Sequence, residues 1–106
     1  MARGIALDVV RIELGSRVAA LDARASRMRG AELAGAIDEI RQIAHAAGLN
    51  PTVTVAHFIE AALARGQSGV LVSGWLDMLR DAIGCERQDV AACGTFAAAC
   101  SVRLAG

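Results

Sequence analysis

The fold is indicated most clearly by residues 31–47, AELAGAIDEIRQIAHAA. Apolar side chains recur there at steps of four, three, four and three residues: Leu33, Ile37, Ile40, Ala44 and Ala47. This spacing places all five on one stripe of an α-helix. The charged and polar side chains fall on the other faces: Glu32, Asp38, Arg41 and His45. Residues 31–47 are therefore predicted to form an amphipathic helix whose apolar stripe packs inward.

The same helical pattern recurs along nearly the whole chain. Four further helices are predicted, over about residues 5–28, 50–65, 71–84 and 89–104. Glycines at the ends of these segments suit helix C-caps: Gly30, Gly48, Gly66 and Gly84. Asn50 and Pro51 are typical of a helix start. The short connections favour antiparallel neighbours. We expect a single all-α domain over residues 1–106, built as a bundle or array of about five short helices.

Individual positions follow from these stripes. The large side chains expected in the core are Leu33, Ile37, Ile40, Trp75 and Leu79. Leu71 and Val90, near the starts of the last two segments, are also expected to face inward. Gly15 and Ser16 interrupt the first segment and mark a candidate bend. Asp89 is expected to cap the last helix.

The chain is more apolar than a soluble monomer needs. Hydrophobic residues make up 55% of its 106 residues and charged residues 21%, and the mean hydropathy is +0.43. One explanation is an alanine-rich compact monomer, and the other, which we favour, is an apolar face covered in a homodimer or by another protein. The candidate interface takes residues from the wide first segment and the alanine-rich last one: Leu7, Val10, Leu14, Ala98 and Val102. Val9 and Ile12 widen the first segment's apolar side.

The charge balance argues against nucleic acid as the main partner. The 11 basic and 11 acidic residues cancel, whereas non-specific affinity grows with the number of phosphates neutralised. Every basic residue is arginine, as is typical of GC-rich, bacterial-like coding sequences. The one basic cluster consists of Arg24, Arg27 and Arg29. It either complements the end of the first helix or contacts an anion.

Localisation is expected to be cytoplasmic. Charged residues interrupt the N-terminal stretch, so no signal peptide is recognised, and no apolar run is long enough to span a membrane. Three cysteines, an odd number without close pairing, suit a reducing compartment.

No set of residues predicts catalysis. The cysteines lack metal-site spacing, and Cys85 has no adjacent histidine to activate a thiolate. Asp77 and Asp81 lie four apart on a face expected to be solvated, where their pKa values would not separate. We therefore predict a protein that is not an enzyme and needs no cofactor or metal.

Two alternatives to a protein-interaction module remain open. Residues 40–65 are arranged like a helix-turn-helix, with Gly48 in the turn; yet the second helix carries no arginine before Arg65, where a reading helix normally needs one. The remote alternative concerns His45, expected on a solvent-facing helix surface. Ala44 and His45 followed by Gly48 resemble the motif of histidine phosphotransfer domains, although the glycine sits one position early and no lysine follows. That resemblance implies a phosphorelay role.

Overall fold

The computed structural model describes residues 2–67, 69–86 and 89–104, and it is all-α. Its helices are α1 (Ala2–Arg24), α2 (Gly30–Ala47), α3 (Asn50–Ala64), α4 (Leu71–Gly84) and α5 (Val90–Leu104), with a 3-10 turn, η1 (Ala25–Arg27), after α1. No strand occurs in these ranges. The prediction of an all-α bundle is therefore confirmed, and each predicted helix exists.

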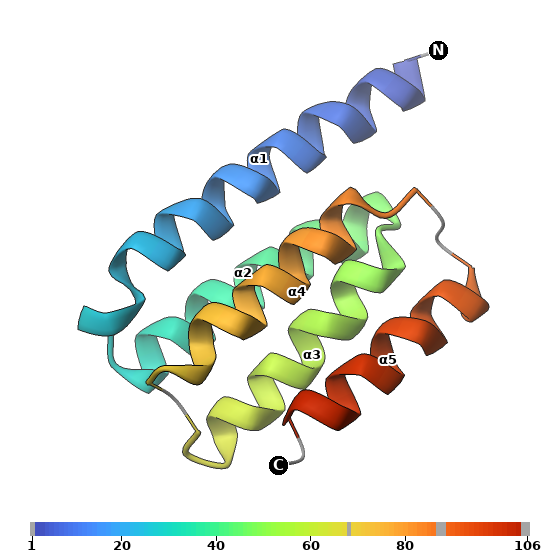
Figure 1. Ribbon diagram of the computed structural model, residues 1–106. Coiled ribbons are helices and arrows are strands. Elements are labelled where there is room, and N and C mark those ends of the chain that lie inside the picture. Colours follow the sequence, from blue (N-terminus) through green and yellow to red (C-terminus); the bar gives the residue numbers. More distant parts are fainter. Residues whose placement is uncertain (1, 68, 87–88, 105–106) are drawn as a thin grey trace.

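Four of the helices close into a bundle. α1 packs against α2 and α4, and α3 packs against the same two helices from the other side. Consecutive helices run in opposite directions, as the short connections require (Figure 1). α5 lies outside this group of four and packs mainly against α3. α1 and α5 consequently occupy opposite sides of the molecule.

Two of the four expected glycine caps, Gly48 and Gly66, have the left-handed backbone conformation that such caps adopt. Gly48 ends α2 in the left-handed region, at φ 75°, and its N–H donates to the carbonyl of His45 at 3.1 Å. The N–H of Ala92 donates to Asp89 Oδ1 at 2.8 Å, so Asp89 caps α5 as predicted. The expected caps at Gly30 and Gly84 are wrong, because Gly30 begins α2 instead and Gly84 is the last residue inside α4, whose C-cap is Cys85 in the extended region. Glu32 Oε1 accepts the N–H of Arg29 at 3.3 Å, which satisfies a donor at the start of α2.

The core lies between the four bundled helices. Leu33, Ile37, Ile40, Trp75 and Leu79 are all buried in it, as predicted. Two boundary positions differ from expectation. Leu71 is about half exposed and Val90 is 88% exposed, because α4 and α5 begin where the chain has not yet reached its packing partner. The candidate bend at Gly15 does not interrupt α1, which runs as one helix from Ala2 to Arg24.

Ion pairs join neighbouring bundle helices near the surface. Arg17 of α1 pairs with Glu39 of α2 at 3.2 Å, and Arg80 of α4 pairs with Asp22 of α1 at 3.0 Å. Pairs this exposed contribute up to about 1 kcal/mol each. The buried apolar side chains therefore carry most of the stability.

Candidate functional site

The helix α5 is only half covered by the rest of the protein. Its inward side consists of Ala92 and Cys100, both buried, and the half-buried Phe96. These three residues recur at steps of four and face the bundle. The opposite side carries Ala91, Gly94, Thr95, Ala98 and Val102, all exposed. We call these five residues the outer face of α5.

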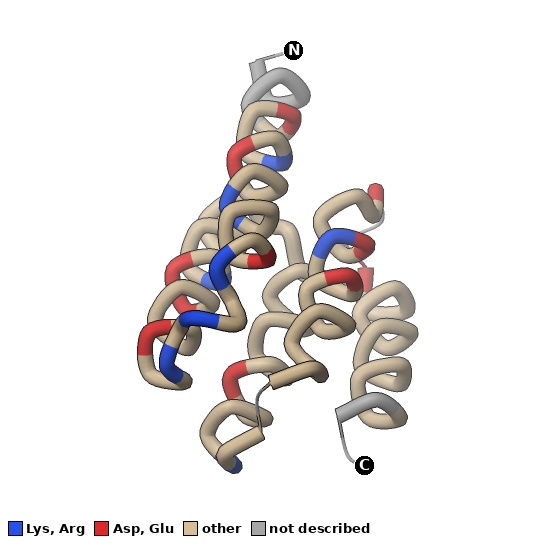
Figure 2. Tube along the Cα trace, turned by 60° about the vertical axis from the view of Figure 1, so that its left-hand side comes forward, with Lys and Arg blue, Asp and Glu red and all other residues tan. Residues whose placement is uncertain are grey.

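The outer face of α5 has no charge. Between Val90 and Val102 the sequence contains no Asp, Glu, Lys or Arg. In Figure 2 the tube of α5 is accordingly tan over this span, whereas the coloured part of α1 carries both blue and red segments. Val102 is 81% exposed. A helix on a protein surface normally places charged and polar residues on its solvent side. α5 has no charged residue on either side over this span, and its exposed polar residues there are Thr95 and Ser101. The absence of charge is the feature that α5 shares with helices that are covered all round.

Gly94 lies on this face, and no contact within the chain requires a glycine at its position. A Cβ built there meets no atom within 4 Å, so no packing inside the chain requires glycine. Glycine within a helix costs about 1 kcal/mol relative to alanine. Thr95 turns its hydroxyl back to the carbonyl of Ala91, at 3.1 Å, which satisfies its donor within the helix. The outer face therefore consists mostly of small side chains, and the Thr95 hydroxyl needs no donor partner outside the helix.

The candidate interface residues on α1 do not belong to this surface. Leu14 is fully buried in the core, and Leu7 and Val10 are half-buried against it. These three residues form the inward stripe of α1, and the full burial of Leu14 corrects its assignment to an intermolecular interface. Among the described side chains of α1, the large apolar ones that are exposed are Val9, at 60%, and Ile12, at 73%. They lie across the molecule from Ala98 and Val102, which the structure leaves exposed on α5.

The three arginines of the basic cluster are placed in different settings. Arg24 is in the last turn of α1, where a cation complements the helix dipole. Arg29 pairs with Glu32 at 3.2 Å at the start of α2. Arg27 ends η1 and is exposed. Of the three, Arg24 lines a groove between α1 and α2.

The two remaining alternatives gain no support from the geometry. α3, which would be the reading helix of a helix-turn-helix, is the central helix and packs against α2, α4 and α5. Six of its residues are buried: Pro51, Thr52, Val55, Ala56, Ile59 and Ala62. His45 is exposed, as predicted, and it lies in the last turn of α2.

A polar cluster between α2 and α3 was not anticipated from the sequence. Arg41 donates to Glu60 across the two helices at 3.2 Å, and it also donates to Asp38 one turn earlier. Hydrogen bonding from Arg41 lowers the pKa of Asp38. Burial raises the pKa of Glu60 above 4.5, outweighing the attraction of Arg41. This arrangement joins α2 to α3, and within it the ionised form of Glu60 is less favoured than in water.

The pH dependence of Glu60 follows from the sign of that shift. An acid whose pKa is raised by folding binds its proton more tightly in the folded state, so acidification through that pKa favours folding. We expect the wild type to gain stability relative to Glu60→Gln as the pH falls from 7 to 4.5. Urea unfolding of both proteins at the two pH values measures this. The shift is contradicted if the free energy of unfolding of the wild type minus that of Glu60→Gln stays constant or falls on acidification.

The other candidate groups are placed as follows. Cys85 is half-buried, and its carbonyl accepts from Arg11 Nη2 at 3.5 Å. Within residues 2–67, 69–86 and 89–104 no group of three or more His, Cys, Asp or Glu side chains is placed to hold a metal ion. In the same ranges no helix combines the length and apolar character needed to cross a bilayer.

The sequence signal for the outer face of α5 was the charge-free run itself, because Ala91, Gly94 and Thr95 are individually unremarkable residues. Comparison of the chain with protein-family models, with curated protein sequences and with solved structures gave no match. Every functional inference about the protein therefore starts from its own residues and their geometry.

Proposed function

We propose that this protein is a helical interaction module that associates with a second copy of itself through the outer face of α5. One observation carries the proposal: α5 is an outside helix with no charged side chain from Val90 to Val102 on either side. Helices that are apolar all round are normally buried. In the isolated chain the outer half of α5 has no cover.

The residue types on this face suit close approach of another helix. Packed helices have axes 8–10 Å apart, and small side chains allow the shorter end of that range. Gly94 and Ala98 lie one turn apart on the face and leave the helix backbone accessible. Val102 then supplies a larger apolar side chain toward the end of the contact.

A second copy is the occupant that the charge pattern favours. A two-fold interface brings the same patch of both copies together, so any charge near its centre would meet its own kind. The outer face of α5 has no charged side chain that would repel its copy. It also has no charged side chain that would select an oppositely charged partner. A face that is neutral, small and apolar is complementary to itself.

The size of the face sets the expected affinity. α5 has 15 residues, which corresponds to a helix about 22 Å long. One face of such a helix covers less than the about 800 Å² per partner of a standard stable interface. We therefore expect a reversible dimer with a dissociation constant of about 10–100 micromolar.

Chemical cross-linking tests the proposal at one position. Ala98→Cys places a thiol at the middle of the outer face, and Ala46→Cys places one on an exposed position of α2 as the matched control. The wild type, treated in the same way, measures the cross-linking that the native cysteines give by themselves. With a short bis-maleimide, Ala98→Cys is expected to form covalent dimer about tenfold faster or more, because association raises the local thiol concentration. Equal rates for the two variants would overturn the proposal.

A further inference from the structure

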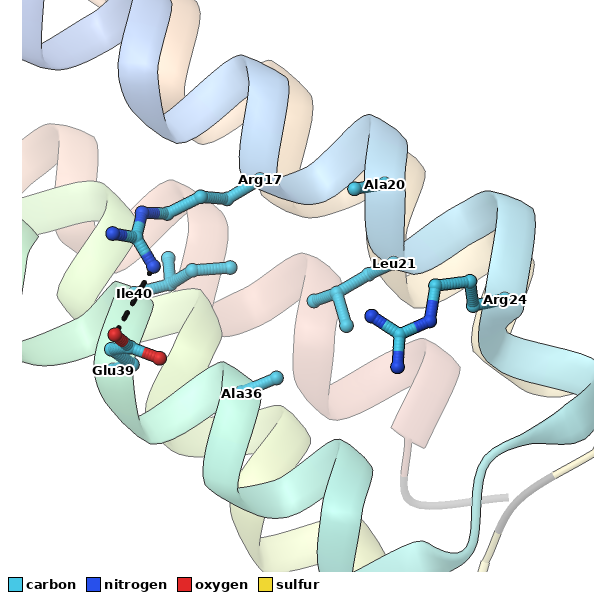
Figure 3. A pocket seen from close by; sticks show the side chains of 7 residues that line it. All are labelled: Arg17, Ala20, Leu21, Arg24, Ala36, Glu39 and Ile40. Atoms are coloured by element: carbon cyan, nitrogen blue, oxygen red, sulfur yellow. Dashed lines mark ion pairs between the residues drawn. The ribbon is translucent and has the colours of Figure 1, made fainter.

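A small groove lies between α1 and α2, away from α5 (Figure 3). Its volume is about 200 Å³, and it is lined chiefly by Arg17, Leu21 and Arg24 of α1 and by Ala36, Glu39 and Ile40 of α2. Leu21 and Ile40 are buried core residues and form an apolar floor. The small side chain of Ala36 leaves the space above that floor open.

The rim of this groove carries two cations and one anion. Arg17 pairs with Glu39 through Nη1, at 3.2 Å. Its Nε is buried and has no hydrogen-bond partner among the described residues, and such an unsatisfied donor is costly. At the Arg17 end Glu39 therefore balances the charge, but the hydrogen-bonding capacity of Nε stays unused.

Arg24 provides the second cation. Figure 3 shows its guanidinium reaching back over the groove toward Leu21. No carboxylate of the described residues lies within 4.0 Å of it. A guanidinium presents a planar fork of donors that matches the two oxygens of a carboxylate. The groove thus holds an unmatched positive charge beside an apolar floor.

We propose that this groove binds a small monocarboxylate with a short apolar tail, its carboxylate on Arg24 and its tail over Leu21 and Ile40. The net charge of the rim is that of one cation, which a monoanion neutralises. Glu39 disfavours a dianion such as hydrogen phosphate. The volume lies below the about 300–1,000 Å³ of pockets for drug-sized ligands, which selects a short molecule.

Nuclear magnetic resonance titration with butyrate tests the site directly. We expect saturable shifts of the Arg24 Nε–H and of the Leu21 and Ala36 amides, with a dissociation constant of about 1–10 mM for so small a ligand. Butanol and inorganic phosphate serve as probes that carry only the tail or only negative charge. Both are expected to shift these signals much less than butyrate at equal concentration.

Variants at two exposed arginines separate the site from a general charge effect. Arg24→Gln is expected to weaken butyrate binding about tenfold, whereas Arg27→Gln, which changes the net charge equally, is expected to leave it unchanged. Because both side chains are exposed, both variants should keep the wild-type amide spectrum elsewhere. Equal binding by the two variants, or shifts from phosphate or butanol as large as those from butyrate, would overturn the assignment. None of these results depends on self-association.

Discussion

Replacing Trp75 with alanine is expected to lower the free energy of unfolding by about 3–5 kcal/mol. Trp75 is 2% exposed and is among the largest fully enclosed side chains of the core. Its removal takes a large apolar surface out of the packed interior and leaves a cavity that its neighbours fill only in part. A domain of this size has a total stability of about 5–15 kcal/mol, so a sizeable fraction of the variant is expected to be unfolded at 37 °C.

Urea unfolding followed by far-ultraviolet circular dichroism measures this loss without relying on the removed fluorophore. Val70→Ala is the matched control, because Val70 is 94% exposed immediately before the same helix. Its effect should stay within about 0.5 kcal/mol. A Trp75→Ala variant as stable as Val70→Ala would show that the interior of the bundle is not packed as described.

Replacing Ala98 with arginine is expected to raise the dissociation constant of the dimer about 100-fold. The new guanidinium lies at the centre of the outer face of α5, where association would bury it without a partner. In a two-fold dimer both copies carry the substitution, so like charges also meet across the interface. Since Ala98 is exposed in the single chain, the fold itself should be unaffected.

Ala46→Arg is the control for this substitution. Ala46 is exposed in the last turn of α2, away from α5, and a cation there complements the helix dipole. Sedimentation equilibrium should give the wild-type dissociation constant for Ala46→Arg and a much larger one for Ala98→Arg. If Ala98→Arg dimerises as tightly as the wild type while keeping its helicity, the interface lies elsewhere.

The periodicity of apolar residues was enough to predict the helices and most of the core. Leu33, Ile37 and Ile40 recur at helical steps, and the structure buries all three. Periodicity identifies the apolar side of a helix but not what covers it. Leu14 was placed in an interface for that reason, although α2 and α4 cover the inward stripe of α1 within the chain.

The candidate sites needed the arrangement of helices in space. Ala98 could be recognised as part of an alanine-rich helix, but its exposure depends on which side of α5 meets α3. Likewise Arg17, Arg24 and Glu39 are distributed over two helices, and only the packing of α1 on α2 brings them to one groove. Position in the sequence gave no indication that Arg24 would be separated from Arg27 and Arg29.

Helix boundaries were harder to predict than helix interiors. The first turn of a helix can precede its contact with the core, as Val90 at the start of α5 shows. Gly30 was expected to end one helix and instead begins the next, because Glu32 supplies the acceptor for the N–H of Arg29 there. Such choices depend on single hydrogen bonds, which residue periodicity does not encode.

Light scattering of the intact wild-type chain over a wide range of concentrations tests the central claim, self-association, most directly. The mass of a single chain is 10.9 kDa. Self-association through α5 predicts an average mass that rises from this value at low micromolar concentration toward twice this value at several hundred micromolar. A mass that stays at 10.9 kDa throughout would contradict the claim and show that the outer face of α5 does not bind a second copy of the chain.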